Sequence, residues 1–427
     1  MKNSASNRQH RDMLGRRDIL GLDEALHLLR MNQPPCPGQK DSVELEKALN
    51  RVCANDILAP ENLPPFPRST MDGYAVRAKD TFGAGEGLPA YLEINGEVLM
   101  GEYPETGPEA GNCFIIATGG ILPPGTDAVV MLEHTINIDG RMIEVVKPVA
   151  AGDNVINTGD DVSRDQVLLA GGRLLRPQEL GLLAGLGIER VNVFRQVRVG
   201  VISTGDEIVP YNQTPPPGKI RDVNSVNLAA LVRNLHALPH FLGITPDNEQ
   251  ELTEALKAGL ATNDIILLSG SSSVGTRDLG ERVIEKMGPP GILLHGVAIK
   301  PGKPVIIARA ADKMIFGLPG HPVSAAVAFD LFVRPVIKKL SGLEDDILPS
   351  HRTLKARLSR NLNSTSGRTD FIRVKLEKMT DKEMAAVPIL GKSGALSTMV
   401  QAHGYLVIRE EQQGLPEGKM VEVILFD

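Results

Sequence analysis

The sequence lacks tryptophan altogether, and phenylalanine and tyrosine bring its aromatic content to only 4%. Proteins that bind single-stranded nucleic acid stack bases on aromatic side chains, so this composition argues against such a surface. Neither sign of charge dominates, because 46 basic residues stand against 52 acidic ones and give a net charge of -6. This balance favours solubility, and no nucleic acid partner is expected.

Cysteine is scarce, and long apolar runs are missing. The three cysteines, Cys36, Cys53 and Cys113, lie far apart without a CxxC spacing, which argues against a disulfide framework or a zinc knuckle. The sequence contains no uninterrupted run of about 18 apolar residues, so no transmembrane helix is predicted. Acidic residues follow the basic pair Arg16 and Arg17, where an export signal would be apolar. We therefore expect a cytoplasmic protein without a membrane partner.

A chain of 427 residues exceeds what one hydrophobic core usually organises, so several domains are expected. Apolar residues recur at helical spacing from Leu22 to Arg30 and predict an amphipathic helix. Asp41 lies three residues before Glu44 in an N-cap arrangement that predicts a second helix. The proline-rich segment 59–67 then interrupts regular structure and marks a domain boundary.

Two kinds of pattern alternate in the first half of the chain. Between residues 74 and 149, short apolar runs are separated by Gly, Pro and Asp turns, which predicts an all-β module. Pro177 to Leu186 then reads as a helix with proline in its first turn. We therefore predict one discontinuous domain from segments 18–63 and 160–192, with the β domain 64–159 inserted into it.

From Val197 onward, apolar strands alternate with helical segments, the pattern of a parallel α/β sheet. This pattern predicts an α/β domain over residues 193–342. Beyond Leu340 the chain returns to short β runs with Gly turns, which predicts a small barrel or sandwich over residues 343–427.

Loops after parallel strands are the natural place for a ligand, because the carboxyl ends of the strands face helix N-termini, whose free amides favour anions. The loop 203–207 (STGDE) follows one predicted strand and carries two carboxylates, although such a turn also serves as an ordinary helix start. The loop 269–278 (SGSSSVGTRD) follows a second strand and suits either a phosphate or a purely structural turn.

A third pair of loops is basic and rich in proline. Residues 300–304 (KPGKP) place two lysines around a Pro-Gly turn, and residues 317–324 (GLPGHPVS) lead into a helix. Proline restricts such loops, so the lysines would be held toward an anionic substrate rather than moving freely. Two surface lysines and a rigid helix entry are the alternative interpretation. Upstream, Asp72-Gly73 and Gly159-Asp160-Asp161 have the composition of a hard-cation site or of ordinary turns.

Taken together and in order, these segments resemble the molybdopterin molybdenumtransferase family, which includes the bacterial MoeA proteins and the corresponding domain of gephyrin. The resemblance covers the chain from about residue 18 to its end. The matching motifs are PF at 65–66, STMDGYA at 69–75, ATG at 117–119, PGTDAVV at 124–130, GDD at 159–161, STGDE at 203–207, KPGKP at 300–304, GLPG at 317–320 and GALS at 394–397.

The resemblance implies a fold and a reaction. The fold would combine an elongated helical dimerisation domain, the inserted β domain, a central parallel α/β domain that binds the pterin, and a C-terminal β-barrel. The reaction would insert molybdate into adenylylated molybdopterin with release of AMP, assisted by Mg2+. The implied homodimer would complete each active cleft with the β domain of the partner subunit. The pterin adenylyltransferase and recipient molybdoenzymes are further expected partners.

The resemblance also implies roles for individual residues. The catalytic acids would be Asp72, Asp161, Glu207 and Asp278, of which Glu207 and Asp278 are also the candidate Mg2+ ligands. The implied substrate-binding residues are Thr118, Thr204, Gly205, Asp247, Ser269, Gly270, Ser273, Gly275, Lys300, Lys303, Pro319, Gly320 and Ser324.

The sequence departs from the family pattern at several positions. These are Ser271, Ser272, Thr276, Arg277 and His321, together with Val223 and His403. The added Arg277 and the missing acid would make the pocket more positive. Tungstate is therefore an alternative to molybdate as the oxyanion substrate. The sequence leaves two other interpretations of the function open: a pterin adenylyltransferase, and a non-catalytic pterin-binding or scaffolding protein. The extra β domain and C-terminal barrel disfavour the first, and the retained acids disfavour the second.

Overall fold

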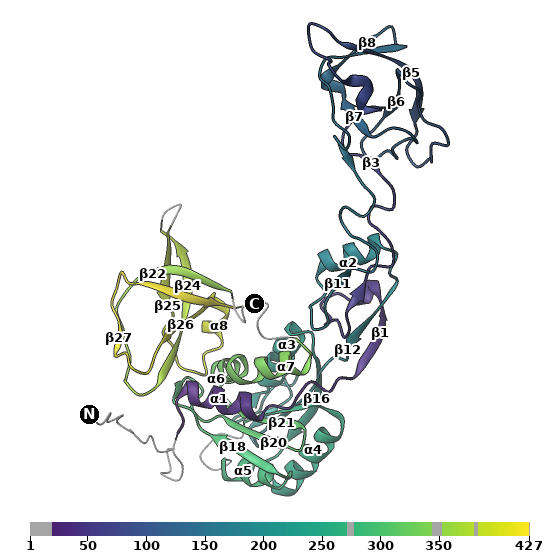
Figure 1. The fold of residues 1–427 in the computed structure, drawn as a ribbon. Helices are drawn as coiled ribbons and strands as arrows, with labels where there is room; N and C mark the ends of the chain where they lie inside the picture. Colours follow the sequence, from purple (N-terminus) through teal and green to yellow (C-terminus); the bar gives the residue numbers. More distant parts are fainter. Residues whose placement is uncertain (1–18, 271–276, 344–351, 380–382, 427) are drawn as a thin grey trace, which may run out of the picture. The chain divides into compact units, whose positions relative to one another are not determined.

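The computed structural model describes residues 19–270, 277–343, 352–379 and 383–426 (Figure 1). The chain divides into two compact units. Unit 1 comprises Met1–Asp41, Asn50–Ala54 and Val193–Asp427, and unit 2 comprises Ser42–Leu49 and Asn55–Asn192. Within the described ranges, no helix combines the length and the apolar character needed to span a membrane.

A six-stranded sheet with the order β16-β13-β17-β21-β20-β18 forms the centre of unit 1. Its strands are β13 (Arg198–Thr204), β16 (Leu238–Thr245), β17 (Ile265–Ser269), β18 (Pro290–His295), β20 (Ile306–Ala310) and β21 (Lys313–Leu318). The first four strands in this order are parallel, and all five residues of β17 are buried. Burial on both faces explains the continuous apolar runs in the sequence.

The prediction of a purely parallel sheet is wrong at one edge. Strand β20 runs antiparallel to both β21 and β18. Only Ala311 and Asp312 separate β20 from β21. A connection this short permits only an antiparallel pair, because a parallel neighbour needs a crossover of a dozen or more residues.

Helices cover both faces of this sheet (Figure 1). They are α1 (Leu22–Asn32), α3 (Asn224–Asn234), α4 (Glu249–Thr262), α5 (Arg277–Glu285), α6 (Pro322–Ala328) and α7 (Arg334–Leu340), with the π-helical turn Phe329–Val333 between the last two. Helices α4 and α5 contribute Leu252, Leu256 and Val283 to the core on one face. Helices α1, α3, α6 and α7 pack into a second core on the other face.

The N-terminal segment differs from its sequence-based assignment. Ala25 and Leu29 of α1 are fully or almost fully buried in the core of unit 1, so α1 packs with the α/β sheet rather than with residues 160–192. The prediction of a second helix beginning near Asp41 is also wrong. Residues Lys40–Glu44 form strand β1, which pairs with β12 (Arg190–Phe194), followed by one 3-10 turn, Leu45–Lys47. Pairing with a distant strand overrides the local capping pattern.

A closed sheet in the C-terminal region settles the choice between barrel and sandwich. The strands are β22 (Thr353–Leu358), β24 (Thr369–Lys378), β25 (Met384–Pro388), β26 (Gly404–Ile408) and β28 (Met420–Leu425). Because β24 pairs with both β25 and β26, the sheet closes into a barrel. Strand β19 (Ile299–Lys300) pairs with β24 in parallel and joins the barrel to the basic loop. A short helix, α8 (Ser397–Gln401), precedes β26.

Unit 2 contains a second six-stranded sheet with the order β7-β4-β6-β5-β9-β8. Its strands are β4 (Gly73–Val76), β5 (Ala90–Val98), β6 (Asn112–Ile116), β7 (Ala128–Met131), β8 (Thr135–Ile138) and β9 (Met142–Val145). The chain enters and leaves this sheet through two antiparallel ribbons. They pair β3 (Arg68–Ser69) with β10 (Val155–Ile156) and β2 (Ile57–Leu58) with β11 (Val167–Leu169). In the described residues of 42–63 and 160–192, the regular elements are the ribbon of β2 and β11, parts of the pair β1 and β12, the turn 45–47 and helix α2 (Pro177–Gly185).

Candidate functional site

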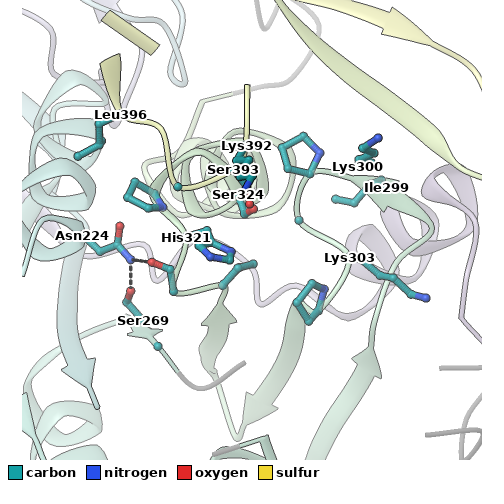
Figure 2. Close-up of a pocket in the computed structure, with 18 of the residues that line it drawn as sticks. Asn224, Ser269, Ile299, Lys300, Lys303, His321, Ser324, Lys392, Ser393 and Leu396 are labelled. Carbon is teal, nitrogen blue, oxygen red and sulfur yellow. Dashed lines mark hydrogen bonds between the residues drawn. The ribbon is translucent and has the colours of Figure 1, made fainter. Parts of the chain in front are cut away.

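A cleft of about 1520 Å³ lies in unit 1, between the carboxyl ends of β13, β17 and β21 and the loops of the barrel (Figure 2). Nine of the sequence-predicted site residues line it: Thr204, Glu207, Ser269, Gly270, Lys300, Lys303, Pro319, Gly320 and Ser324. The strand-end loops therefore come together as parallel topology requires. Asp247 does not line the cleft but accepts a 3.0 Å hydrogen bond from the Thr204 hydroxyl, and its amide donates to Asp206.

Glycine is required where the first two loops meet. Gly270 has φ +107°, and a Cβ at this position would lie 2.1 Å from the carbonyl oxygen of Thr204. An atom cannot be accommodated at that distance, so only glycine lets the ends of β13 and β17 approach this closely. Gly205 also lies in the positive-φ region, at +144°, beside the carboxylate of Glu207.

One side of the cleft is basic. Lys300 and Lys303 lie on this side in Figure 2, and neither has an ion-pair partner in the part of the chain that the structure describes. Lys392, from the barrel loop, also lines the cleft. Such lysines suit an anionic ligand, because no carboxylate among the described residues neutralises them.

The barrel contributes two arginines that the sequence motifs did not indicate. Arg368 pairs with Asp370 at 2.9 Å. Arg373 is buried and donates hydrogen bonds to the Thr398 hydroxyl at 2.5 Å and to the carbonyl of Gly391 at 2.8 Å. Burial lowers the pKa of Arg373. These bonds fix the loop after β25, which carries Lys392 into the cleft.

The other side of the cleft, the acceptor side, is lined by Ser203, Asp222 and Asn224, each of which has a buried side-chain oxygen without a hydrogen-bond partner among the described residues. Asn224, the first residue of α3, donates from Nδ2 to the Ser269 hydroxyl at 2.7 Å and to the carbonyl of Gly320 at 2.8 Å (Figure 2). Asp222 accepts at Oδ1 from the amide of Ser225 at 3.0 Å. Neither Asp222 nor Asn224 was predicted as a site residue, because the sequence pattern did not indicate the two-residue strand β15 (Ile220–Arg221) that precedes them.

Two predicted residues of unit 2 form a contact of their own. The backbone amide and the hydroxyl of Thr118 both donate to Asp72 Oδ1, at 2.7 and 2.9 Å. These two bonds lower the pKa of the exposed Asp72 carboxyl. The carboxylate of Asp72 is thus held ionised and in a fixed direction.

The other predicted acid of unit 2 is Asp161. Its backbone amide donates to the Leu63 carbonyl, and its side chain is exposed.

Part of the predicted site lies outside the described residues. Ser273 and Gly275 belong to the segment 271–276, as do the departures Ser271, Ser272 and Thr276. The side chains of Arg277 and Asp278 are likewise not described. His321, which differs from the family pattern, lines the cleft beside Gly320.

The magnesium prediction can be tested against the donor set. Over the described ranges, no group of three or more His, Cys, Asp or Glu side chains could hold a metal ion. Glu207 alone of the two predicted ligands is described, and it lines the cleft. Mg2+ usually binds one or two carboxylates together with phosphate oxygens. The described residues therefore do not form a magnesium site by themselves.

Three family models match successive parts of the chain. They are the MoeA N-terminal region (domain I and II) over residues 20–187, a probable molybdopterin binding domain over residues 200–339, and the MoeA C-terminal region (domain IV) over residues 355–426. A molybdopterin molybdenumtransferase of Haemophilus influenzae is 36% identical over 414 residues, 96% of this chain and 99% of the relative.

Other relatives agree. A molybdopterin molybdenumtransferase of Bacillus subtilis is 32% identical over 97% of this chain and 96% of its own. A crystal structure of the molybdopterin biosynthesis MoeA protein from Pyrococcus horikoshii OT3 matches with a TM-score of 0.82 and 33% identity, covering 96% of this chain and 100% of that one. The chain belongs to the MoeA family of molybdopterin molybdenumtransferases.

Membership of the MoeA family confirms the resemblance inferred from the motifs. The cleft lies mostly within the region matched by the probable molybdopterin binding domain, and the MoeA C-terminal region supplies Arg368, Arg373 and Lys392. In this chain the barrel thus contributes to the lining of the cleft and is not only an appended domain.

Proposed function

We propose that this chain transfers molybdenum from molybdate to the dithiolene sulfurs of adenylylated molybdopterin and releases AMP. The observation that carries the proposal is the division of one large cleft into a basic side and an acceptor side. The names of the relatives and the match to a probable molybdopterin binding domain supply the class of substrate. Molybdate and the phosphates are anions, for which Lys300 and Lys303 are suited.

The chemistry needs the groups that line this cleft. The phosphoanhydride bond breaks with uptake of one oxygen, from water or from molybdate, and AMP leaves. The two sulfurs replace oxygens of molybdate, which leave as hydroxide or water. Lys300 and Lys303 stabilise the negative charge on the oxyanion and on the leaving phosphate. Glu207 and Asp278 are proposed to bind Mg2+ jointly with the phosphate oxygens, the usual donor set of that ion.

We also propose that the working enzyme is a homodimer in which Asp72 and Asp161 act on the cleft of the partner subunit. The supporting observation is that Asp72 is exposed and yet held in one direction by Thr118. Co-expression of Asp72→Ala and Glu207→Ala subunits tests this arrangement. Heterodimers would carry one intact site, so activity should return to about a quarter of the wild-type value, whereas each variant alone stays inactive. No recovery would contradict a shared site.

The role of the basic side is tested by neutralising Lys303. Losing one charge close to a bound anion costs about 1 to 2 kcal/mol, so Lys303→Gln should raise the KM for molybdate about 10-fold. The matched control is Lys313→Gln, because Lys313 bonds the Leu260 carbonyl outside the cleft. An unchanged KM in Lys303→Gln would remove that lysine from the oxyanion site.

Two alternatives are outcomes of the same assay. A higher turnover with tungstate than with molybdate at equal concentration would identify a tungstate-preferring enzyme. Tight pterin binding with neither oxyanion leading to AMP release would favour a non-catalytic binding or scaffolding role.

A further inference from the structure

The acceptor side of the cleft contains three buried atoms without a hydrogen-bond partner in the described part of the chain. They are Ser203 Oγ, Asp222 Oδ2 and Asn224 Oδ1. All three residues line the cleft, and their exposed fractions are 3%, 4% and 6%. Buried polar atoms in folded proteins are almost always hydrogen-bonded, so three orphans around one cleft call for a ligand.

The direction of the Asn224 amide follows from its neighbours. The Gly320 carbonyl oxygen can only accept a hydrogen bond, so the Nδ2 group of Asn224 must face it. Oδ1 therefore points away from Gly320 and Ser269, as Figure 2 shows. Asp222 Oδ1 is occupied by the Ser225 amide, which leaves Oδ2 unbonded. The two carbonyl-type oxygens cannot satisfy each other, because both are acceptors.

A ligand for this side must therefore present at least two adjacent donors. The pterin ring has such an edge, since its pyrimidinone half carries an N3–H and a 2-amino group side by side. We propose that Asp222 Oδ2 and Asn224 Oδ1 accept hydrogen bonds from this edge and that the Ser203 hydroxyl completes its recognition. This inference rests on the proposed function for the identity of the substrate, and it adds which residues recognise the pterin and how it is oriented.

The orientation follows from the opposite chemistry of the two sides. Asn224 and Ser269 lie on one side in Figure 2, and Lys300 and Lys303 lie on the other. A pterin edge at Asn224 would direct the phosphates and the dithiolene toward the lysines. The reverse orientation would bring a phosphate against the Asp222 carboxylate, which like charge disfavours.

Two other ligands are less compatible with this side. The N-terminus of α3 could attract an anion, but Asp222 already accepts from the first turn and places a negative charge there. A divalent cation could also bind the three unbonded oxygens. However, one carboxylate oxygen and two neutral oxygens make a weak ligand set for Mg2+ when no phosphate is bound. Magnesium binding is therefore an outcome of the test and not the proposal.

The experiment compares 6-hydroxymethylpterin with 6-hydroxymethyllumazine, in which a carbonyl replaces the 2-amino group. Calorimetric titration of the wild-type protein should show about 10- to 100-fold tighter binding of the pterin than of the lumazine. In the lumazine, the 2-carbonyl oxygen would face an acceptor oxygen of the protein and could not form a hydrogen bond with it. Asp222→Asn keeps the oxygen that accepts from Ser225 and turns the other acceptor into a donor. It should weaken pterin binding about 10-fold or more and abolish the preference.

Stability of the ligand-free protein separates recognition from a structural role. Removing an unbonded buried hydroxyl costs no internal hydrogen bond, so Ser203→Ala should leave the thermal midpoint unchanged or raise it while weakening pterin binding. The matched control is Asp264→Asn, outside the cleft, where the carboxylate accepts from Arg195 and from the Arg198 amide. It should lower the thermal midpoint and leave the pterin-to-lumazine ratio unchanged.

The outcomes distinguish this inference from the proposed function. Equal or absent binding of both compounds by a wild-type protein that inserts molybdenum would overturn the pterin-edge assignment and leave the function intact. A pterin preference that depends on Asp222 in a protein without insertion activity would support the edge and contradict the function. Tight binding of Mg2+ alone that disappears in Asp222→Asn would replace the pterin edge by a cation site.

Discussion

The close approach of β13 and β17 predicts a severe effect of adding one methyl group. In Gly270→Ala, the new Cβ would lie 2.1 Å from the Thr204 carbonyl oxygen at a φ of +107°. Gly243→Ala is the matched control, because Gly243 has a φ of +109° and nothing within 4 Å of its Cβ position. The two variants share the backbone cost and differ only in the steric overlap.

The magnitudes can be separated in the same way. A positive φ costs a non-glycine residue about 1 to 2 kcal/mol, which is the whole expected effect at Gly243. Overlap with a packed neighbour adds about 1 to 3 kcal/mol at Gly270. For a domain of this size, about 1 kcal/mol shifts the midpoint by about 2 to 4 °C, so Gly270→Ala should melt about 2 to 12 °C below Gly243→Ala.

Differential scanning calorimetry of the unit 1 transition measures this difference, and the insertion assay measures its consequence. Because the clash separates Thr204 from Ser269, Gly270→Ala should also lose most of its activity at temperatures where it remains folded. Gly243→Ala should keep its activity. Equal midpoints for the two variants would refute the close approach and with it the geometry of the acceptor side.

Two further predictions concern carboxylates of unit 2. Hydrogen bonds from Thr118 lower the pKa of Asp72, so Thr118→Val should raise that pKa part of the way to its usual value. An NMR titration of the Asp72 carboxyl measures this change. Thr126→Val is the control and should leave the pKa of Asp72 unchanged. Glu179 is buried between two arginines, and its bond to Arg176 is the main cause of its pKa of about 2. A lowered pKa stabilises the fold above the ordinary value of 4.5, and this stability, about 1 to 3 kcal/mol, is lost as pH falls toward 2. Glu179→Gln should therefore lower the thermal midpoint at pH 7 and flatten its decline in acid; a parallel decline in both proteins would contradict this assignment.

Local patterns were sufficient for much of unit 1. The apolar runs at 197–202, 264–268 and 314–318 match β13, β17 and β21 to within about two residues, because these strands are almost wholly buried. The antiparallel direction of β20 was missed because it is fixed by a two-residue connection and not by hydrophobicity. Strand β1 was predicted as a helix because its partner, β12, lies about 150 residues away in the sequence.

The candidate site was predictable to the extent that it follows strand ends. The loops at 203–207 and 269–278 were singled out because they follow predicted strands, and the loop at 300–304 because of its lysines and prolines. Described residues of all three loops line one cleft. Asp222 and Asn224 carry no motif, and their importance is visible only from unbonded atoms in the folded chain. Arg373 was missed because its role depends on tertiary bonds to the loop that carries Lys392.

The central claim is tested most directly by AMP release from adenylylated molybdopterin by the purified protein, with and without molybdate. We predict release that requires molybdate, leaves molybdenum on the pterin in equal amount, and is lost in Asp278→Ala. Tight binding of the substrate without AMP release under molybdate or tungstate would contradict the account and indicate a pterin-binding protein without transferase activity.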